Sequence, residues 1–448
     1  MSRVGRSAPH RGFLLVTTLL GAACNTPEPA TSPRLLSADL GRPGGAFDFT
    51  PLPASAVCTV SGGDPFDPIL LPDGYGQTII AAEPSFANAI DMNTQNESGP
   101  DAGRYLYRPT EGAIGEVSVT DLRTLVTRRI AFRADWESMD PIAWTPWGTL
   151  LVGEETGNRS RPDPDYPGAI GGLMYELFLA QGDPTTVERI VARPALGAKA
   201  HEGTRIDPQG NVYGISETNP GHIYRFVPDR RGDLSSGQLY ALRVVTPTGD
   251  RTGEAEWIPL DRAAVQVDAN AAATAAGATG WNRPEDLELA TSSGGSAGGS
   301  NILYVAVTGQ SGPADNRVLA VELREPAGGA EHATAFVYDY VKVGLNVSSD
   351  FTMPDNLALN KQGDLYIAED PGGSFPTKTR GDDLWMARPG SGPRAPASSV
   401  VRFASLTDCD AEPTGIYFDI GGSRLFVNVQ HRGGDGRDFA VAVDRAPE

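Results

Sequence analysis

Residues 355–370 read DNLALNKQGDLYIAED, and two further stretches align with them without a gap: DPIAWTPWGTLLVGEE at 140–155 and EGTRIDPQGNVYGISE at 202–217. In each stretch an acidic residue is followed after eight positions by glycine and after fifteen positions by a second acid. Alternating apolar residues on both sides of the glycine are typical of two β-strands. Asp or Asn followed by glycine is typical of a tight turn between them. The repeated unit is therefore predicted to be a β-hairpin with an acid at each open end.

Looser copies of this hairpin bring the series to six. They begin at 88–91, 285–288 and 412–415 and lead to apolar strands at 105–107, 303–305 and 425–427. The units recur at intervals of roughly 50 to 80 residues, which indicates a propeller or a repeat array. Blades of four strands close into a ring without exposed edges. The sequence therefore predicts an all-β fold, a six-bladed β-propeller with a short helical insertion in the alanine-rich stretch 261–280.

The N-terminus predicts export. Three arginines in the first eleven residues precede the apolar run 13–20 and small residues before Cys24, which is the order of a signal peptide. The preceding residues resemble a bacterial lipoprotein box, so we expect a signal peptide at 1–23 and lipidation of Cys24. Ordinary cleavage nearby is the alternative. Either way the mature protein is expected outside the cytoplasm, as a periplasmic protein, an outer-membrane or cell-surface lipoprotein, or a secreted protein.

Beyond the signal peptide, the chain divides into two parts. Residues 24–57 are rich in Pro, Ser, Thr and Ala and are predicted to be a linker, and residues 58–448 form the predicted propeller. Cys58 and Cys409 stand near the two ends of that propeller. In an oxidising compartment one disulfide between them would latch the ring; two buried free thiols are the alternative.

Composition excludes several functions. The formal net charge of -19 argues against a nucleic-acid partner. Five histidines without zinc-ligand spacing argue against a zinc hydrolase. The GGSAG stretch at 294–298 matches a nucleophile elbow only formally, because no helix follows it.

The repeated acids predict a metal site. Antiparallel strands bring both acids of a hairpin to the same end of the blade, so the blades together place carboxylates at one mouth of a central channel. The candidates are Asp140, Glu154, Glu155, Glu202, Glu217, Glu285, Asp286, Asp355, Glu369, Asp370 and Glu412. Clustered carboxylates repel one another unless protons or cations compensate, and oxygen ligands suit calcium, manganese or ferric iron. For any single acid, a solvated strand end is the alternative.

Several of these stretches together resemble the successive motifs of the PhoX alkaline phosphatases. They are DPIAWTPWGTLLVGEE at 140–155, AHEG at 200–203, NRPEDLE at 282–288, PDNLALNKQGDLYIAED at 354–370 and EPTGIYFDIGGSRLFVNVQH at 412–431. The resemblance extends from about residue 70 to the end of the chain, with the motifs in the expected order. It implies an exported six-bladed propeller that hydrolyses phosphate monoesters with an iron and calcium cluster.

This resemblance and the acid pattern together assign roles to residues. We expect metal ligands at Asp140, Glu154, Glu155, Glu202, Glu285, Asp355 and Glu412, and catalytic roles for Glu154, Glu202, His431 and Arg283. His431 could donate a proton, and Arg283 or Arg432 could neutralise the phosphate; pairing of either arginine with a carboxylate is the alternative. His201 could orient or ligate beside Glu202, or be a hydrogen-bonded structural residue.

One position departs from the family pattern. The family ordinarily has a cysteine that ligates iron just before the paired glutamates, and here that position is Gly153. Calcium is therefore the expected cofactor, with iron second, and the expected partner is a small phosphorylated substrate, with membrane contact only through a lipid anchor. Two other functions stay open: a gluconolactonase-like lactone hydrolase with one divalent ion, and a non-catalytic, calcium-stabilised binding lipoprotein.

Overall fold

A computed structural model describes residues 49–58, 62–291, 301–309, 315–324, 333–371, 379–434 and 436–446. The predicted signal peptide, Cys24, most of the predicted linker and the GGSAG stretch lie outside these residues. Within the described part of the chain, no helix has the length and apolar character needed to cross a membrane.

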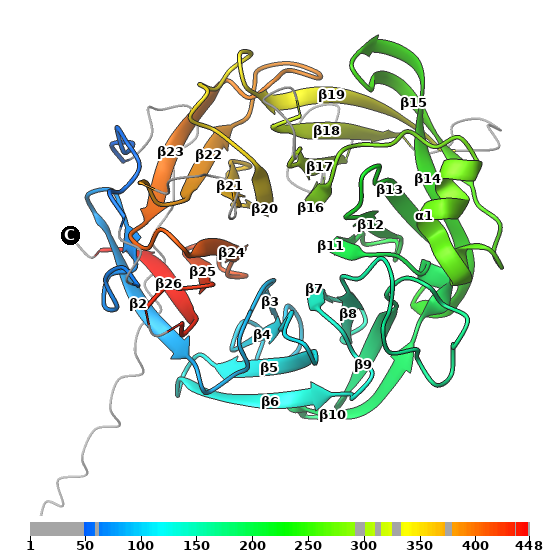
Figure 1. The fold of residues 1–448 in the computed structure, drawn as a ribbon, viewed down its shortest axis with the longest axis horizontal. Helices are drawn as coiled ribbons and strands as arrows, with labels where there is room; N and C mark the ends of the chain where they lie inside the picture. The colour runs from blue at the N-terminus through cyan, green and yellow to red at the C-terminus, as the bar shows by residue number, and fades with distance from the viewer. Residues whose placement is uncertain are drawn as a thin grey trace, which may run out of the picture. The chain divides into compact units, whose positions relative to one another are not determined.

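The chain folds into a ring of six antiparallel blades, as predicted (Figure 1). Blade 1 comprises β3 (Thr94–Gln95), β4 (Tyr105–Pro109), β5 (Glu116–Asp121) and β6 (Val126–Phe132). Blade 2 comprises β7 (Met139–Trp144), β8 (Leu150–Glu154), β9 (Met174–Ala180) and β10 (Asp183–Ala192). Blade 3 comprises β11 (His201–Ile206), β12 (Val212–Ser216), β13 (Ile223–Arg230) and β14 (Asp233–Gly249).

Blades 4 to 6 repeat this plan. Blade 4 comprises β16 (Pro284–Ala290), β17 (Ile302–Val307), β18 (Arg317–Arg324) and β19 (Thr334–Lys342). Blade 5 comprises β20 (Pro354–Leu359), β21 (Leu365–Glu369), β22 (Asp383–Arg388) and β23 (Ser399–Leu406), with β1 (Ile69–Leu70) at its outer edge. Blade 6 comprises β24 (Glu412–Phe418), β25 (Arg424–Gln430), β26 (Phe439–Arg445) and β2 (Tyr75–Ala82). The innermost strands of the six blades, β3, β7, β11, β16, β20 and β24, surround the axis of the ring (Figure 1).

Blades pack face to face, so their central strands are buried on both sides. In β21, Leu365 and Ile367 face a cluster shared with blade 4, whereas Tyr366 and Ala368 face a cluster shared with blade 6. This explains why the second strand of each hairpin is nearly continuous in apolar residues. The turn glycines have the left-handed backbone that the sequence pattern requires, with φ of +84° at Gly148, +90° at Gly210 and +83° at Gly363.

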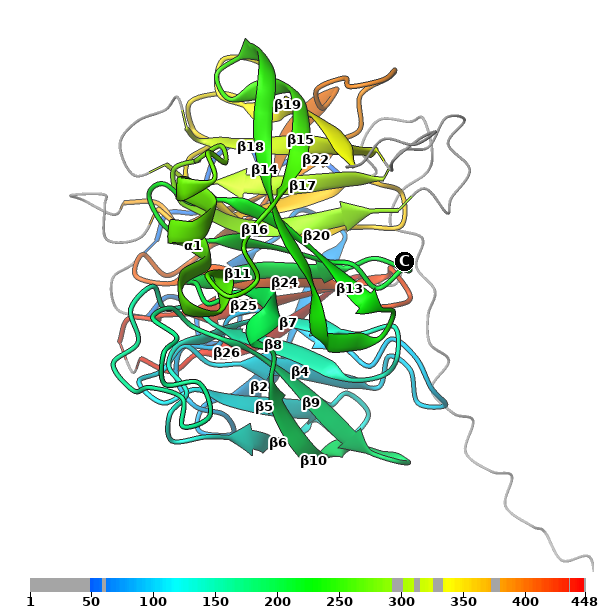
Figure 2. The same cartoon turned by 90° about the vertical axis from the view of Figure 1, so that its right-hand side faces the viewer.

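Two features lie outside the regular blades. Strand β15 (Thr252–Pro259) pairs with both β14 and β19 and so joins blades 3 and 4 into one nine-stranded sheet. Helix α1 (Val265–Ala275) forms the predicted helical insertion and lies at the outer edge of the ring beside β14 (Figures 1 and 2). The 3-10 helix η1 (Pro194–Leu196) lies in the connection that leads into blade 3.

The two ends of the described chain close the ring. Strand β2 completes blade 6 by pairing with β26 over its full length, and Cys58 forms a disulfide with Cys409, with 5.0 Å between the Cα atoms. The outermost strand of the last blade thus comes from the N-terminal part of the described chain, which ties the two ends together.

The linker predicted over 24–57 extends too far. Residues 49–58, which we call the strap, pack on blade 5: Phe49 is 7% exposed, and its ring meets those of Tyr75 and Phe403 edge to face. The Ala56 amide donates to Ser405 Oγ at 2.9 Å. Apolar burial and backbone hydrogen bonds thus hold a segment whose composition alone suggested an unpacked tether.

Candidate metal centre

The inner strands carry the repeated acids on β-bulges. The pairing register shifts directly at Asp140, Glu202, Glu285 and Asp355, each of which follows the first paired residue of its strand. A bulge interrupts the regular alternation of side chains and redirects the bulged residue. Equivalent bulges therefore give these four carboxylates equivalent positions at one end of the ring.

The second acid of each hairpin lies at the same end. Glu155, Glu217 and Asp370 directly follow strands β8, β12 and β21. Blade 1 adds Asp91 and Glu111, which follow the two residues of the isolated bridge between Ile90 and Thr110. We call the whole set the acid ring: Asp91, Glu111, Asp140, Glu155, Glu202, Glu217, Glu285, Asp355, Asp370 and Glu412.

Backbone strain recurs beside these acids. The residue two positions before the acid has a left-handed backbone in four blades: Ala89 (φ +63°), Ser138 (φ +39°), Arg283 (φ +47°) and Met353 (φ +41°). Non-glycine residues adopt this conformation rarely, at a cost of about 1 kcal/mol or more each. Its recurrence at equivalent positions shows that the approach to the acid is a shared structural feature of the blades.

Three of the carboxylates are close enough to share one cation. One oxygen from each of Glu155, Glu202 and Glu217 lies within 4.8 Å of the others. Oxygen ligands at about 2.4 Å from a calcium ion lie up to roughly 5 Å from one another. The spacing of these three glutamates therefore fits a single hard cation.

Burial and mutual repulsion raise the pKa of seven carboxyls in the acid ring. Burial is the largest cause in every case, and neighbouring carboxylates add to it; for Glu202 these are Asp140, Glu155 and Glu285. The seven residues are Asp91, Asp140, Glu155, Glu202, Glu285, Asp355 and Glu412. Such a cluster favours protons or cations over free negative charge.

Several oxygens of the ring find no N–H or hydroxyl donor among the residues that the structure describes. They are both carboxylate oxygens of Asp140 and the Oδ1 atoms of Asp91 and Asp370, all buried. Buried acceptors without donors are uncommon in folded proteins. Because the unsatisfied atoms are oxygens, the residues fit a hard cation, which would satisfy several of them at once.

Arg283 brings positive charge into the acid ring. Its Nε donates to Glu217 Oε1 at 2.7 Å, and its Nη2 lies 3.0 Å from Glu285 Oε1. Burial opposes its charge, but the two glutamates outweigh burial and raise the pKa of Arg283. The structure thus places this predicted catalytic residue at the site, paired with carboxylates.

Glu154 does not join the acid ring, contrary to the prediction of metal-binding and catalytic roles. It is fully buried within blade 2, where it pairs with Arg159 and accepts hydrogen bonds from the Leu173 amide at 3.0 Å and the Tyr175 hydroxyl at 3.3 Å. Burial raises its pKa to about 7 despite the charge of Arg159. Successive residues of a strand point to opposite faces, so only the adjacent Glu155 reaches the ring.

Two further candidate acids also have structural partners. Glu369 accepts from the Thr352 amide and Trp385 Nε1, both at 2.8 Å. Asp286 accepts from the Leu357 amide at 2.8 Å and so links blade 4 to blade 5. These contacts position the strands that carry the ring.

The histidines differ in their surroundings. His201 is 2% exposed, with Nδ1 at 3.0 Å from Lys199 Nζ and Nε2 at 3.0 Å from the Gly197 carbonyl oxygen. It is therefore a buried structural residue. The side chain of His431 is 53% exposed, and its Nε2 lies 3.9 Å from Glu412 Oε1, at the rim of the acid ring.

Arg432 is not available to a substrate in the way predicted. It donates to the carbonyl oxygens of Gly62 and Arg437 and packs 4.0 Å above the ring of Phe439. It therefore fixes the loop after β25.

Gly153 is enclosed by its neighbours. A Cβ atom at this position would lie 2.9 Å from Pro141 Cγ and 3.0 Å from His201 Cβ, and would overlap Met174 Sδ. The space beside this strand is therefore filled by other side chains. The acid ring has oxygen ligands without a thiolate from this position.

Sequence patterns missed Asp91 and Glu111 as site residues. The connection between β3 and β4 spans 96–104, longer than in the aligned hairpins, which removes the fixed spacing of acids. Blade 6 also deviates: its bulge begins at Gly415, with φ of +55°, and Glu412 stands three residues earlier, at the start of β24.

Comparisons with known proteins agree with the fold. The model of the family described as alkaline phosphatase PhoX matches residues 143–433. The structure of Pseudomonas fluorescens PhoX in complex with vanadate, a transition state analogue, has 18% sequence identity and a TM-score of 0.61, and the match covers 87% of this chain and 98% of that one. A gluconolactonase from Xanthomonas campestris has 12% identity and a TM-score of 0.45, with 86% and 96% of the two chains covered. No curated protein sequence matches the chain.

Proposed function

Because the chain belongs to the PhoX family of alkaline phosphatases, we propose that it is a metal-dependent phosphoric ester hydrolase that acts at the acid ring. The observation that carries this proposal is the set of buried carboxylate oxygens without donors in the described part of the chain, together with three glutamates whose oxygens lie within 4.8 Å of one another. Family membership supports phosphatase chemistry. The carboxylate oxygens of the acid ring support a role for bound cations in that chemistry.

We propose calcium as the principal cation. The donors of the ring are carboxylates, which prefer hard cations. Gly153 leaves no room for a side chain beside Met174 and Pro141, so the soft ligand that would favour iron is missing from that position. The absence of a thiolate from that position weakens the case for iron, whereas calcium and manganese need carboxylates alone.

The proposed substrate is a small phosphate ester. Cations held by Glu155, Glu202 and Glu217 would supply positive charge to the phosphoryl oxygens and to the attacking oxygen. Hydrolysis forms a new P–O bond from water and breaks the bond to the leaving oxygen, which takes up a proton. The vanadate complex of the Pseudomonas fluorescens relative supports phosphoryl transfer as the reaction class.

Two side chains of the chain itself complete the proposed site. Arg283 lies between Glu217 and Glu285, and a cation bound by these glutamates would free its guanidinium to contact a phosphoryl oxygen. His431 is half exposed at the rim of the ring. It is the proposed donor of the proton to the leaving oxygen.

The test is release of phosphate by the mature protein. The protein is stripped with a chelator and assayed on a generic aryl phosphate with calcium, manganese or iron restored. Glu202→Gln is expected to lower kcat/KM by about a hundredfold or more, whereas Glu188→Gln, at an exposed position of β10, serves as the matched control. Inactivity of the wild type with every metal would refute the proposed function.

We also propose export, with a signal peptide at 1–23 and lipidation of Cys24. The disulfide between Cys58 and Cys409 supports an oxidising compartment. Cell fractionation of the wild type and of Cys24→Ser tests both parts: recovery of both proteins in the cytoplasm would exclude export, and identical membrane association of both would exclude the lipid anchor.

A further inference from the structure

The loops that carry Glu412 and His431 meet beside the disulfide. Cys409 stands three residues before Glu412, and Gly433 stands two residues after His431. Both loops lie at the same end of blades 5 and 6 as the acid ring. The first joins the end of β23 to the start of β24, and the second follows Gln430, the last residue of β25, which pairs with Glu412.

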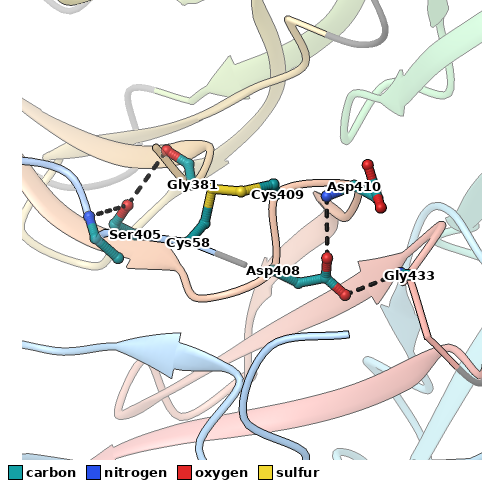
Figure 3. The surroundings of a disulfide bond; sticks show 8 residues. Cys58, Gly381, Ser405, Asp408, Cys409, Asp410 and Gly433 are labelled. Carbon is teal, nitrogen blue, oxygen red and sulfur yellow. Dashed lines mark hydrogen bonds between the residues drawn. A yellow bond between two sulfur atoms is a disulfide. The ribbon is translucent and has the colours of Figure 1, made fainter. Parts of the chain in front are cut away.

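Asp408 connects the two loops through hydrogen bonds. Its Oδ2 accepts from the Gly433 amide at 2.9 Å and its Oδ1 from the Asp410 amide at 3.0 Å (Figure 3). The side chain is almost fully buried, with 1% of the residue exposed. One carboxylate therefore fixes the backbone before Glu412 and the backbone after His431 together.

The N-terminal segment packs into the same junction. A Cβ at Gly62 would lie 2.9 Å from the Gly433 carbonyl oxygen, and a Cβ at Gly63 would lie 2.8 Å from the Asp408 amide nitrogen. Both glycines also have positive φ, +98° and +59°. The backbone of this segment thus fits against both loops only because these residues have no side chain.

The disulfide anchors the strap next to this junction. Cys58 is 9% exposed and Cys409 is 3% exposed, whereas the adjacent Val57 is 90% exposed. Within the strap, Val57 therefore faces solvent, while the disulfide beside it is covered. Hydrogen bonds from Ala56 to Ser405, and from Ser405 to the Gly381 carbonyl oxygen, continue this attachment to blade 5 (Figure 3).

We propose that the Cys58–Cys409 disulfide, Asp408 and Gly62–Gly63 act together as a clamp that positions Glu412 and His431 at the acid ring. Their functional importance rests on the proposed phosphatase activity, but the clamp is a structural claim that is testable without it. Asp408 is a positioning residue: it acts through Glu412 and His431. Oxidation of the two cysteines is then needed for full activity as well as for stability.

Hydrogen exchange tests the clamp directly. In Asp408→Ala, and in the double variant Cys58→Ser/Cys409→Ser, the amides of 409–412 and 431–434 are expected to exchange about tenfold faster than in the wild type. Asp408→Asn keeps one acceptor oxygen and should restore part of the protection. Val321→Ala, in the fully buried part of β18, is the control: it lowers global stability without touching either loop.

The same variants are compared for calcium affinity and for kcat and KM separately. Loss of a group that orients ligands weakens metal binding by about tenfold or more, and a displaced His431 should lower kcat with little change in KM. Reduction of the wild type should reproduce the double cysteine variant and should not affect that variant itself.

The outcomes separate the clamp from the proposed function. Unchanged exchange at 431–434 in Asp408→Ala and in the double cysteine variant, or an equal rise in Val321→Ala, would overturn the clamp even in an active enzyme. A wild type without calcium binding or phosphate release would overturn the function, while the exchange data would still decide the clamp. If the double cysteine variant folds poorly, the reduced wild type and Asp408→Asn are used to test the clamp instead.

Discussion

Neutralising Glu202 should stabilise the metal-free protein and weaken its response to calcium. Glu202 is 7% exposed, and one of its oxygens lies within 4.8 Å of oxygens of Glu155 and Glu217. Glu202→Gln removes one negative charge from this triad while keeping the size of the side chain. In the absence of cations, the substitution lowers the repulsion among the three carboxylates. In the presence of calcium, the same substitution removes a charged ligand. The two effects have opposite signs, which an ordinary packing defect would not produce.

The magnitudes follow from distance and size. Two unit charges at 4.8 Å repel by about 3 kcal/mol at an effective dielectric constant of about 20, so neutralising one of them should stabilise the metal-free protein by about 1–3 kcal/mol. A ring of roughly 390 residues unfolds with an entropy of about 0.8 kcal/mol/K. The metal-free variant should therefore melt about 1–4 °C above the metal-free wild type.

Calcium offsets the difference between the two proteins. At a concentration a hundred times the dissociation constant, one site adds about 2.7 kcal/mol, or about 3 °C for a protein of this size. The wild type should gain this increment for each site, and Glu202→Gln should lose it at the site formed with Glu155 and Glu217. Scanning calorimetry in chelator and in excess calcium measures all four states, with Glu188→Gln as the control.

The pH dependence follows from the raised pKa values of the buried carboxyls, among them Asp140 and Glu202. A carboxyl whose pKa is higher in the folded state binds its proton more tightly there, so its contribution to stability is complete below the unfolded-state pKa and is lost as pH rises. The metal-free protein should lose stability from about pH 4 upward, and saturating calcium should flatten this loss. A metal-free Glu202→Gln that melts below the wild type, with an unchanged calcium increment, would refute the reasoning.

Three further predictions concern single positions. Gly153→Cys should destabilise the protein by about 1–3 kcal/mol through overlap with Met174 and Pro141, and Met174→Ala in the same chain should recover part of the melting temperature; an unchanged melting temperature in the single variant would show that the space is open. Glu154 has a pKa of about 7 in the folded protein against a usual 4.5, so its contribution to stability is present below pH 4.5 and is lost by about pH 7. Glu154→Gln should therefore make the free energy of unfolding less dependent on pH in this window. An identical slope in the variant and the wild type would contradict the raised pKa. Gly415→Ala should cost at least about 1 kcal/mol, because φ at this position is +55° and a Cβ would lie 2.8 Å from an amide nitrogen of Asn93; a denaturant midpoint equal to that of the wild type would exclude this strain.

The sequence predicted the features that local periodicity determines. Three aligned hairpins with fixed acid and glycine positions were enough for the blades, and the turn conformations at Gly148, Gly210 and Gly363 followed from the same pattern. The alanine-rich insertion became helix α1 as expected. Closure by β2 on β26 pairs residues more than 350 positions apart, and no local pattern contains that information.

The hairpin pattern predicted acids at the open ends of the blades, but it did not determine which of them come together in the ring. Which of two adjacent glutamates enters the ring depends on the face of β8, and a one-residue difference sends Glu154 to Arg159 and Glu155 to the ring. Glu111 was not predicted because the long connection between β3 and β4 changes the spacing of acids in blade 1. Contacts between residues far apart in the sequence, such as the hydrogen bond from Arg432 to the carbonyl oxygen of Gly62, form only when the ring is closed.

The acid ring and the closure of the propeller are energetically connected. Carboxylates that repel one another across all six blades push the inner strands apart when no cation is bound, and strained residues such as Ser138 and Met353 add to that cost. The pairing of β2 with β26 and the Cys58–Cys409 disulfide join the two ends of the described chain and oppose this separation. The stability that closure of the ring provides therefore offsets the repulsion among the carboxylates of the acid ring. Under the proposed function, cations would bind a ligand set already held in place, and their binding energy would not be spent on assembling it.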